Sequence, residues 1–254
     1  MITADYAGRH RRDGEDRSRP MAGWSRSPML AAQVVVIAKE PVPGRVKTRL
    51  TPPFTPAEAA ELATAALTDT FAAVAASPVA RRILAVQGTP GPWLPPGFDV
   101  IGQRGPGLDE RIAWALIDAR ITLPVPVVLI GMDTPQVTPE LLAAAAGPLV
   151  SGGADATFGP AEDGGFWLLG LRKIDPALVR GVPMSRPDTG AQQLARLKRA
   201  GLRIRMLSAL TDVDTVREAE QVATEIPDSA FAACLQRLRA ETAERAETAE
   251  PALA

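Results

Sequence analysis

Residues 33–50 read QVVVIAKEPVPGRVKTRL, an apolar run that passes directly into a basic turn. A second apolar run, PVVLIG, occupies residues 126–131. Strands that are apolar on both faces are typical of parallel sheets whose two faces are covered by helices. These two runs therefore predict the centre of a parallel sheet, with the basic turn following its first strand.

Further short β-branched runs alternate with Ala/Leu-rich stretches along the chain. We predict the other strands at 82–87, 154–158, 165–171 and 203–207, and helices near 56–76, 108–120, 138–149, 189–200, 214–224 and 228–245. This alternation predicts a single-domain α/β fold, a mostly parallel doubly wound sheet in an α/β/α sandwich. Ligands of such folds bind outside the carboxyl ends of the strands, which selects the loops at 39–50, 102–107, 132–135, 159–164 and 208–214.

The two ends of the chain differ in composition from the middle. Residues 1–28 mix both charges with Gly, Ser and Pro and have no apolar period, so we expect a disordered leader, with Met1, Met21 or Met29 as the start. Residues 29–226 are expected to form the nucleotide-dependent domain. Residues 227–254 are expected to form a C-terminal helix and low-complexity tail, because RAETAE occurs twice, at 239–244 and 245–250.

Composition excludes several classes of function. Lys and Arg total 28 against 29 Asp and Glu, so no global charge attracts nucleic acid. His10 and Cys234 are the only residues of their types, which excludes Ser/His/Asp catalysis, Cys/His zinc sites and an internal disulfide. No apolar run approaches the ~20 residues of a membrane span, so we expect a cytoplasmic protein. Carboxylates, lysines and arginines are left, which suit Mg²⁺ or Mn²⁺ and phosphate groups.

The basic turn after the first strand is the predicted phosphate site. Its cations are Lys39, Arg45, Lys47 and Arg49, and Gly44 shapes a turn whose backbone N–H groups can face an anion. The turn matches neither the GxxxxGK[ST] loop nor the GxGxxG fingerprint. The alternative interpretation is a solvated basic loop.

Three acidic positions follow other predicted strands. Asp133 lies in GMDTP at 131–135 and is a candidate metal ligand, since Thr138 is the better N-cap for the next helix. Asp212, in TDVDT at 211–215, could complete the metal site, whereas we assign Asp214 to capping the helix after it. Asp163 is the third candidate ligand.

The loop that holds Asp163 has the sequence GPAEDGGFW at 159–167. Its two glycines permit close approach of a substrate to the backbone, so Glu162, Asp163, Gly164 and Gly165 are candidate substrate-binding residues. Asp163 could also anchor an acceptor hydroxyl. Asp-Gly is equally a favourable hairpin turn, which is the structural alternative.

A glycine-rich stretch, GQRGPGLDER at 102–111, opens a predicted helix. Such a loop can admit a flat nucleobase against backbone groups, or can simply connect two elements. We take Gly105, Gly107 and Arg111 as candidate nucleotide contacts.

Together the motifs resemble the GT-A-like nucleotide-diphospho-sugar transferases, a superfamily that includes the molybdenum cofactor and deazaflavin-cofactor guanylyltransferases. The nearest resemblance is to bacterial glycosyltransferases of the arsenosugar-biosynthesis type, through PVPGRVKTRL at 41–50, GMDTPQVTPELL at 131–142, GPAEDGGFWLLGL at 159–171 and TDVDT at 211–215. The resemblance implies nucleotide phosphates on the 44–49 turn, metal at Asp133 and an acceptor or second metal contact near Asp163. Trp167 stands where Tyr is commoner, and the strict Asp-x-Asp at 133–135 is missing.

The expected function is a metal-dependent transfer from an activated nucleotide to a small-molecule acceptor, with Lys47, Asp133 and Asp163 as the catalytic candidates. Glycosyl transfer from a nucleoside-diphosphate sugar is the leading hypothesis. Nucleotidyl transfer from a triphosphate, with release of pyrophosphate, is the alternative, and a catalytically inactive nucleotide-binding module is a third. The nucleobase, the sugar, the acceptor and the choice between monomer and homodimer stay open.

Overall fold

The computed structural model describes residues 28–249, so the predicted leader falls outside the described residues except for Pro28. The strands of this part of the chain are β1 (Leu30–Lys39), β2 (Val79–Gln87), β3 (Asp99–Gly102), β4 (Val127–Ile130), β5 (Ala156–Pro160), β6 (Phe166–Leu171) and β7 (Ile204–Met206). Its α-helices are α1 (Pro56–Ala76), α2 (Leu108–Thr122), α3 (Pro139–Ser151), α4 (Thr189–Arg199), α5 (Val216–Glu225) and α6 (Ala230–Ala249). Short 3-10 turns lie at Thr48–Leu50 and Pro176–Leu178.

The strands form one seven-stranded sheet in the order β3-β2-β1-β4-β6-β5-β7. β6 runs antiparallel to both of its neighbours, and every other pairing is parallel. The mostly parallel sheet predicted from the sequence is therefore confirmed. Because β6 is reversed, the loop from β5 to β6 lies at the same edge as the carboxyl ends of β1 and β4.

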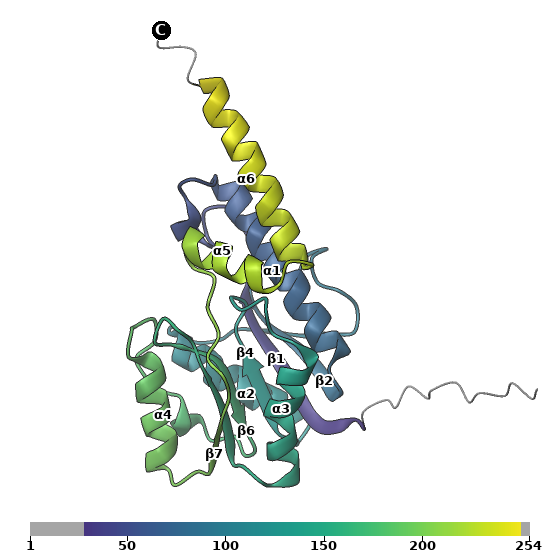
Figure 1. The fold of residues 1–254 in the computed structure, drawn as a ribbon. Coiled ribbons are helices and arrows are strands. Elements are labelled where there is room, and N and C mark those ends of the chain that lie inside the picture. The colour runs from purple at the N-terminus through teal and green to yellow at the C-terminus, as the bar shows by residue number, and fades with distance from the viewer. Residues whose placement is uncertain (1–27, 250–254) are drawn as a thin grey trace, which may run out of the picture.

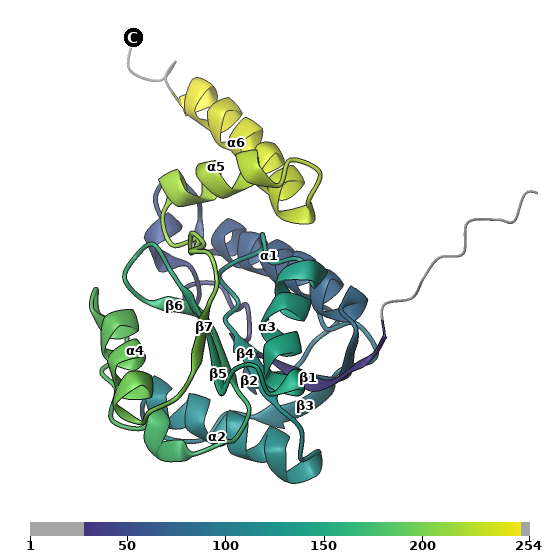
Figure 2. The same cartoon turned by 60° about the horizontal axis from the view of Figure 1, so that its bottom comes forward.

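Helices cover both faces of the sheet, as Figures 1 and 2 show. In β1, Val34 and Val36 pack into a core with α1 and α3, whereas Val35 and Ile37 pack into a second core with α2 and α4. All four valine and isoleucine side chains are buried. Burial on both faces explains why this strand has no polar alternation.

The prediction missed β3 at one end of the sheet. Asp99, Val100 and Gly102 are exposed, so the strand carries no buried apolar pattern that a sequence could reveal. Its conformation comes from parallel pairing with β2, from Ile83 opposite Asp99 to Val86 opposite Gly102. Pairing with β2, and not the local sequence pattern, therefore makes these residues a strand.

A third core lies beside the sandwich and joins α5 and α6 to α1. Phe231, Leu235 and Leu238 of α6 pack with Leu62 and Ala66 of α1. The predicted C-terminal helix thus begins as part of the folded body and continues outward to Ala249 (Figure 1).

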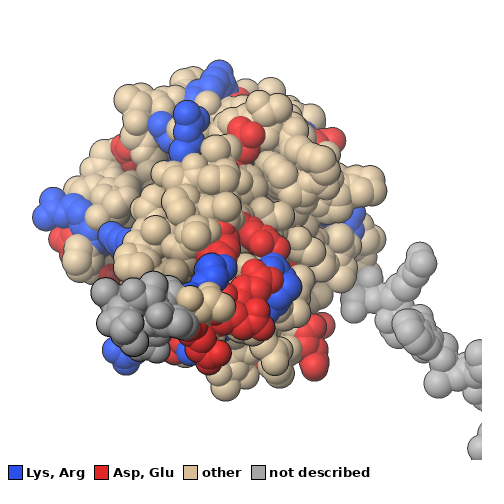
Figure 3. Space-filling view, turned by 90° about the horizontal axis from the view of Figure 1, so that it is seen from above, with Lys and Arg blue, Asp and Glu red and all other residues tan. Residues whose placement is uncertain are grey.

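Charged side chains hold the outer part of α6 against α1. Arg237 pairs with Glu61, and Arg245 lies 2.8 Å from Glu58. In Figure 3, which looks down on this end of the molecule, acidic and basic side chains are interspersed near the end of the described chain. This face therefore presents no large patch of one sign.

One described helix, α1, is long and apolar enough to cross a membrane. This corrects the expectation that no apolar run approaches the length of a membrane span. However, 61% of its most apolar window is buried inside the fold. Its apolar residues are accounted for by two cores, one against the sheet and one against α6.

Candidate active site

Backbone hydrogen bonds join three of the loops at the carboxyl edge of the sheet. Val213 N–H donates to Asp133 O at 2.8 Å, and Glu162 N–H donates to Leu210 O at 3.0 Å. The side-chain amide of Gln136 adds a 2.7 Å bond to Thr211 O. The segment at 208–214 therefore runs between the loop after β4 and the loop after β5.

The basic turn reaches this assembly through Lys47. Val46 and Leu50 are buried on either side and anchor the turn in two different cores. Lys47 itself has a φ of 49°, a left-handed conformation that is uncommon for a residue with a Cβ. Such local strain persists where the surroundings impose it, and here the lysine side chain is drawn inward.

The buried Lys47 ammonium lies at the centre of an ion cluster. It donates to Asp133 Oδ1 and to Val213 O, and it lies 3.5 Å from Asp214 Oδ1. Only 5% of the lysine side chain is exposed. Burial acts to lower the pKa of Lys47, but the nearby carboxylates outweigh it and raise the pKa above its ordinary value, so the lysine stays charged.

Asp214 belongs to this cluster, which corrects its assignment as a helix cap. The N-cap of α5 is Thr215, whose hydroxyl accepts from Glu218 N–H while Glu218 accepts from Thr215 N–H. The Thr-x-x-Glu pattern at 215–218 is a capping box and could have identified the true cap. Because Thr215 caps the helix, the Asp214 carboxylate is free to face Lys47 and Arg49.

The four cations of the basic turn separate into two pairs. Lys47 binds Asp133, and Arg49, whose side chain is 75% exposed, lies 3.2 Å from Asp214 Oδ2. Lys39 and Arg45 instead line a hollow of about 190 Å³ together with Gln87. The structure therefore does not gather all four cations at one point, because two of them neutralise the acidic residues of neighbouring loops.

Gly44 shapes the basic turn, as the sequence predicted. Its φ is 75°, which favours glycine, and Arg45 N–H donates to Val42 O at 3.0 Å across the turn. A Cβ at Gly44 would meet no atom within 4 Å. The surface beside this glycine is thus open to a ligand.

Asp212 is the residue of the cluster whose charge is least compensated. Its Oδ1 is buried and has no hydrogen-bond partner among residues 28–249. Burial, together with the negative charges of Asp133 and Asp163, raises the pKa of Asp212 to about 7. A buried carboxylate oxygen in this state offers a place for a cation.

A divalent ion fits this site only if the protein supplies some of its ligands and a bound phosphate and water supply the rest. Within the described part of the chain, no three Asp, Glu, His or Cys side chains are arranged to hold a metal ion by themselves. The predicted ligands Asp133, Asp163 and Asp212 are thus not assembled as a closed protein cage, and Lys47 already occupies Asp133. Mg²⁺ in nucleotide sites commonly takes one or two carboxylates and completes its shell with phosphates and water. Asp212 suits such a shared site.

The turn between β5 and β6 places its two acidic side chains differently. Asp163 is exposed, and its Oδ1 accepts from Gly165 N–H at 2.7 Å. Glu162 accepts a 2.8 Å hydrogen bond from the Thr211 hydroxyl, so in this structure it ties two loops together. Both side chains are exposed, but Glu162 is fixed to a neighbouring loop whereas Asp163, among the described residues, bonds only within its own turn.

The two glycines after Asp163 make room for neighbouring backbone. A Cβ at Gly164 would lie 1.8 Å from Pro187 O, and Gly190 N–H donates to Gly164 O at 2.7 Å. The close approach that these glycines permit is thus made by the chain's own 187–190 segment. Their predicted role with substrate stays a prediction.

The glycine-rich loop lies beside the hollow lined by Lys39 and Arg45. The Arg111 guanidinium donates to Gly105 O at 3.2 Å and to Gln87 Oε1 at 2.5 Å, and Gln87 lines that hollow. Gln103 fastens the loop to the ends of β1 and β2 through bonds to Ala38 O and Ala85 O. Arg111 therefore supports the hollow rather than pointing into open solvent.

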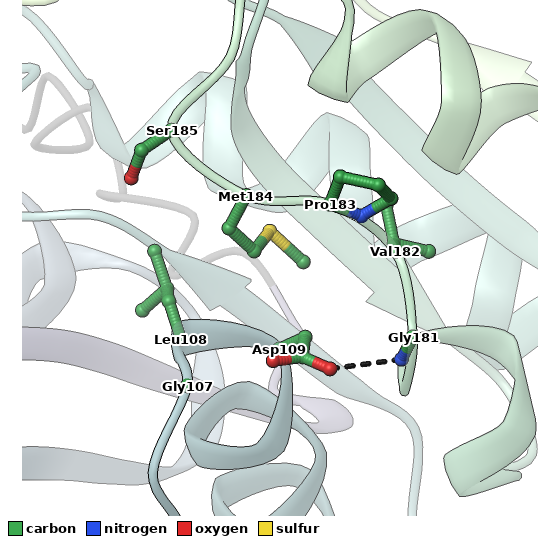
Figure 4. A pocket seen from close by; sticks show the side chains of 8 residues that line it. All are labelled: Gly107, Leu108, Asp109, Gly181, Val182, Pro183, Met184 and Ser185. Atoms are coloured by element: carbon green, nitrogen blue, oxygen red, sulfur yellow. Dashed lines mark hydrogen bonds between the residues drawn. The ribbon is translucent and has the colours of Figure 1, made fainter.

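Gly107 contributes to a second, larger hollow of about 430 Å³. The opposite wall is the segment at 181–185, which the sequence analysis did not single out (Figure 4). This segment has no motif of its own, and its position depends on contacts with α2 and with the 161–165 turn. Sequence reasoning had no signal for it.

Comparisons with known proteins place the chain in a family and a fold. A family model described as an uncharacterised protein conserved in bacteria, DUF2064, matches residues 59–186. No curated protein matches the sequence. Among solved structures, a protein from Desulfovibrio desulfuricans G20, provisionally described as a nucleotide-diphospho-sugar transferase, is 27% identical with a TM-score of 0.76. The match covers 85% of this chain and 98% of that one.

Two other matches are more distant. The 2-C-methyl-D-erythritol 4-phosphate cytidylyltransferase from Thermus thermophilus is 14% identical over 83% of this chain and 99% of its own, with a TM-score of 0.46. Glucosyl-3-phosphoglycerate synthase from Mycobacterium tuberculosis, in complex with Mn²⁺, UDP and glucosyl-3-phosphoglycerate, is 13% identical over 72% and 71%, with a TM-score of 0.46. These two similarities say nothing about the reaction of this chain.

Proposed function

The chain belongs to the DUF2064 family, and we propose that it is a metal-dependent glycosyltransferase that uses a nucleoside-diphosphate sugar. The observation that carries the proposal is the buried, unpartnered oxygen of Asp212 beside the Lys47–Asp133 ion pair in the described part of the chain. A buried carboxylate oxygen without a hydrogen-bond partner among residues 28–249, next to a loop with exposed cations, suits a metal–diphosphate complex. The similarity to the Desulfovibrio protein supports the same class of donor.

The exposed cations of the basic turn are the proposed diphosphate ligands. Lys39 and Arg45 line a hollow of about 190 Å³, and Arg49 is exposed at its side chain. Lys47 reaches a phosphate only by leaving Asp133. Its first role is therefore to neutralise Asp133 and to hold the 211–214 segment in place.

The transfer itself joins the acceptor to the sugar. The oxygen of an acceptor hydroxyl forms a bond to the anomeric carbon, the bond from that carbon to the diphosphate oxygen breaks, and the nucleoside diphosphate leaves. Asp163, which is exposed, is the proposed acceptor of the hydroxyl proton. A bound Mg²⁺ or Mn²⁺ would supply positive charge to stabilise the leaving diphosphate. Asp212 would hold it, and Asp133 would join through Oδ2, the oxygen that Lys47 does not contact.

Nucleotidyl transfer is the second candidate, and one observation favours it. Asp133 is followed by Thr134 and Pro135, and Thr134 is buried, so this loop offers a single carboxylate to a metal. In this reaction an acceptor oxygen attacks the α-phosphorus and pyrophosphate leaves. A cytoplasmic location and a small-molecule acceptor are part of both proposals.

A thermal-shift and calorimetric screen tests the proposal. The probes are UDP-glucose, GDP-mannose, UTP, GTP and CTP, each with Mg²⁺, with Mn²⁺ or with EDTA. A ligand present at 100 Kd should stabilise the protein by about 2.7 kcal/mol. We expect a diphosphate sugar to bind and only with metal; tighter binding of a triphosphate, with pyrophosphate as product, selects nucleotidyl transfer.

A pair of lysine variants tests whether the nucleotide binds in the hollow lined by Lys39. Lys39→Ala should weaken nucleotide binding about tenfold or more, since a charge-assisted contact contributes roughly 1.5–3 kcal/mol. Lys173→Ala is the control, because Lys173 is exposed and follows the opposite end of β6. Equal affinities of the two variants, or no binding by any probe, would reject the proposed site.

A further inference from the structure

A hollow of about 430 Å³ lies between the first turn of α2 and the 181–185 segment (Figure 4). Its volume is within the range of small-molecule sites, roughly 300–1,000 Å³. The apolar part of its lining comes from Leu108, Val182, Pro183 and Met184. Asp109 is the only ionisable side chain among the lining residues of this hollow.

Side chains hold the 181–185 segment in a defined position. Gly181 N–H donates to Asp109 Oδ2 at 2.8 Å, which fastens the segment to α2. The buried Thr189 hydroxyl donates to Pro183 O at 2.9 Å and accepts from Arg186 N–H at 3.1 Å. Between these points Ser185 has a φ of 57°, a left-handed conformation for a residue with a Cβ. These hydrogen bonds therefore fix the position of this wall of the hollow.

The same segment runs from the hollow to the turn that carries Asp163. Pro187 O lies against Gly164, where an added Cβ would come within 1.8 Å of it. Gly190 N–H then donates to Gly164 O at 2.7 Å. The segment that forms one wall of the hollow therefore continues, through residues 187–190, to the turn on which the proposed proton acceptor stands, while Lys39 and Arg45 line the other hollow.

We propose that the 430 Å³ hollow binds the acceptor, and that the acceptor is an uncharged alcohol with an apolar skeleton. This inference rests on the proposed transferase function. The four apolar side chains of the lining favour an apolar skeleton, Ser185 and backbone groups supply polar surface beside them, and the carboxylate of Asp109 disfavours an anion. Asp109 Oδ2 is engaged by Gly181, whereas Oδ1 lies beside Gly107, where an added Cβ would come within 2.5 Å. Oδ1 is the oxygen that accepts a hydroxyl hydrogen from the ligand.

Methionine-methyl NMR tests this inference on the full chain. Met184 lines the hollow, and Met132, which accepts from Lys39 N–H at 3.2 Å, stands beside Asp133. Met206 is exposed on β7 and provides a reference signal. The three signals are assigned with single Met→Leu variants. Benzyl alcohol, toluene and benzoate are the probes, because the same ring carries a hydroxyl, no polar group or a negative charge.

We expect benzyl alcohol to shift the Met184 methyl signal at a lower concentration than toluene does, and benzoate to leave it unchanged. Met206 should not move with any probe. In a separate titration, UDP, GDP or CDP with Mg²⁺ should shift Met132. The Met184 methyl group therefore reports the larger hollow, and the Met132 methyl group reports the region beside Lys39 and Asp133.

Two variants and one control test the role of Asp109. In Asp109→Asn the amide oxygen can still accept from Gly181 N–H, but a neutral N–H donor replaces the charged oxygen offered to the ligand. The alcohol oxygen can accept from this N–H, but the stronger charge-assisted hydrogen bond is lost, so benzyl alcohol should bind about tenfold more weakly. Leu108→Trp should abolish the Met184 shift by filling the hollow; Leu108 is 40% exposed, so the larger side chain is tolerated. Asp118→Asn, on the same helix but outside the hollow, should change nothing.

The outcomes separate the inference from the proposed function. A Met132 shift with nucleotide but no Met184 shift with benzyl alcohol overturns the acceptor hollow and leaves the transferase proposal standing. Equal Met184 responses to all three probes, or an unchanged response in Asp109→Asn, also overturn it. A Met184 shift without any Met132 response removes the acceptor role, because the transferase proposal on which it rests would then have failed.

Discussion

Two clusters of aspartate and basic side chains lie at opposite edges of the sheet, and they differ in how completely their charges are paired. At the amino end of β5, Asp155 accepts from the guanidinium groups of Arg172 and Arg203 and from Arg203 N–H. These hydrogen bonds hold the pKa of Asp155 well below its usual range. Both oxygens of this carboxylate therefore have partners inside the protein.

The cluster at the carboxyl edge has the same residue types but a different balance. Lys47 serves Asp133 and Asp214, and the buried oxygen of Asp212 is left without a partner among the described residues. The pKa of Asp212 is raised, whereas that of Asp155 is lowered. Fully paired charges indicate a structural role, and a buried unpaired carboxylate indicates a place for a ligand.

The largest expected effect comes from removing the buried lysine. Lys47→Met leaves the partly exposed carboxylates of Asp133 and Asp214 without their shared cation, so we expect the free energy of unfolding to fall by about 2–3 kcal/mol. Urea unfolding at neutral pH measures it. Arg49→Met is the matched control, since Arg49 is exposed and its ion pair should contribute less than about 1 kcal/mol. Equal losses in the two variants would show that the burial of Lys47 does not matter.

A smaller effect of opposite sign is expected at Asp212. Asp212→Asn removes a charge whose buried Oδ1 has no hydrogen-bond partner among residues 28–249 and which faces the carboxylates of Asp133 and Asp163, so in EDTA the free energy of unfolding should rise by about 1–3 kcal/mol. Added Mg²⁺ or Mn²⁺ should stabilise the natural sequence more than this variant. A loss of stability in EDTA would mean that the Asp212 carboxylate already has a stabilising partner. The contrast with the fully paired Asp155 would then be wrong.

The smallest effect concerns the paired cluster and depends on pH. The pKa of Asp155 is lower in the folded state than in the unfolded state, so its stabilisation is present above the ordinary pKa of 3.8 and is lost as pH falls below it. The melting temperature of Asp155→Asn should therefore be lower than that of the natural sequence at pH 7, and the difference should shrink as the pH falls toward about 3. Nucleotide binding by this variant should be unchanged. A constant difference across this range would assign another role to Asp155.

Some elements of the fold could be predicted from the sequence alone. The apolar runs at 33–38 and 126–131 predicted central strands because a strand buried on both faces must be apolar throughout, and both lie in the centre of the sheet. The helix near 56–76 was predicted from its Ala-rich stretch with the observed bounds, and in the structure Thr55 and Glu58 form a capping box at its start. Edge strand β3 was missed because it buries too little to leave a pattern.

Within the site, the sequence predicted which loops meet but not how their charges combine. It placed Lys47, Asp133 and Asp212 at one edge, because carboxyl ends of parallel strands share an edge. It did not predict that Lys47 would turn inward, that Asp214 would join it, or that Arg45 and Lys39 would line a separate hollow. Those outcomes depend on distances between loops that are far apart in the chain.

The sequence by itself determined the α/β class, the central strands and the set of loops at the carboxyl edge, because burial periodicity and helix capping are local properties. Only the tertiary structure decided which charges neutralise each other and that the 181–185 segment closes a hollow against α2. Ion pairing and cavity shape depend on positions such as 47, 133 and 212, which the chain brings together only when the sheet is complete.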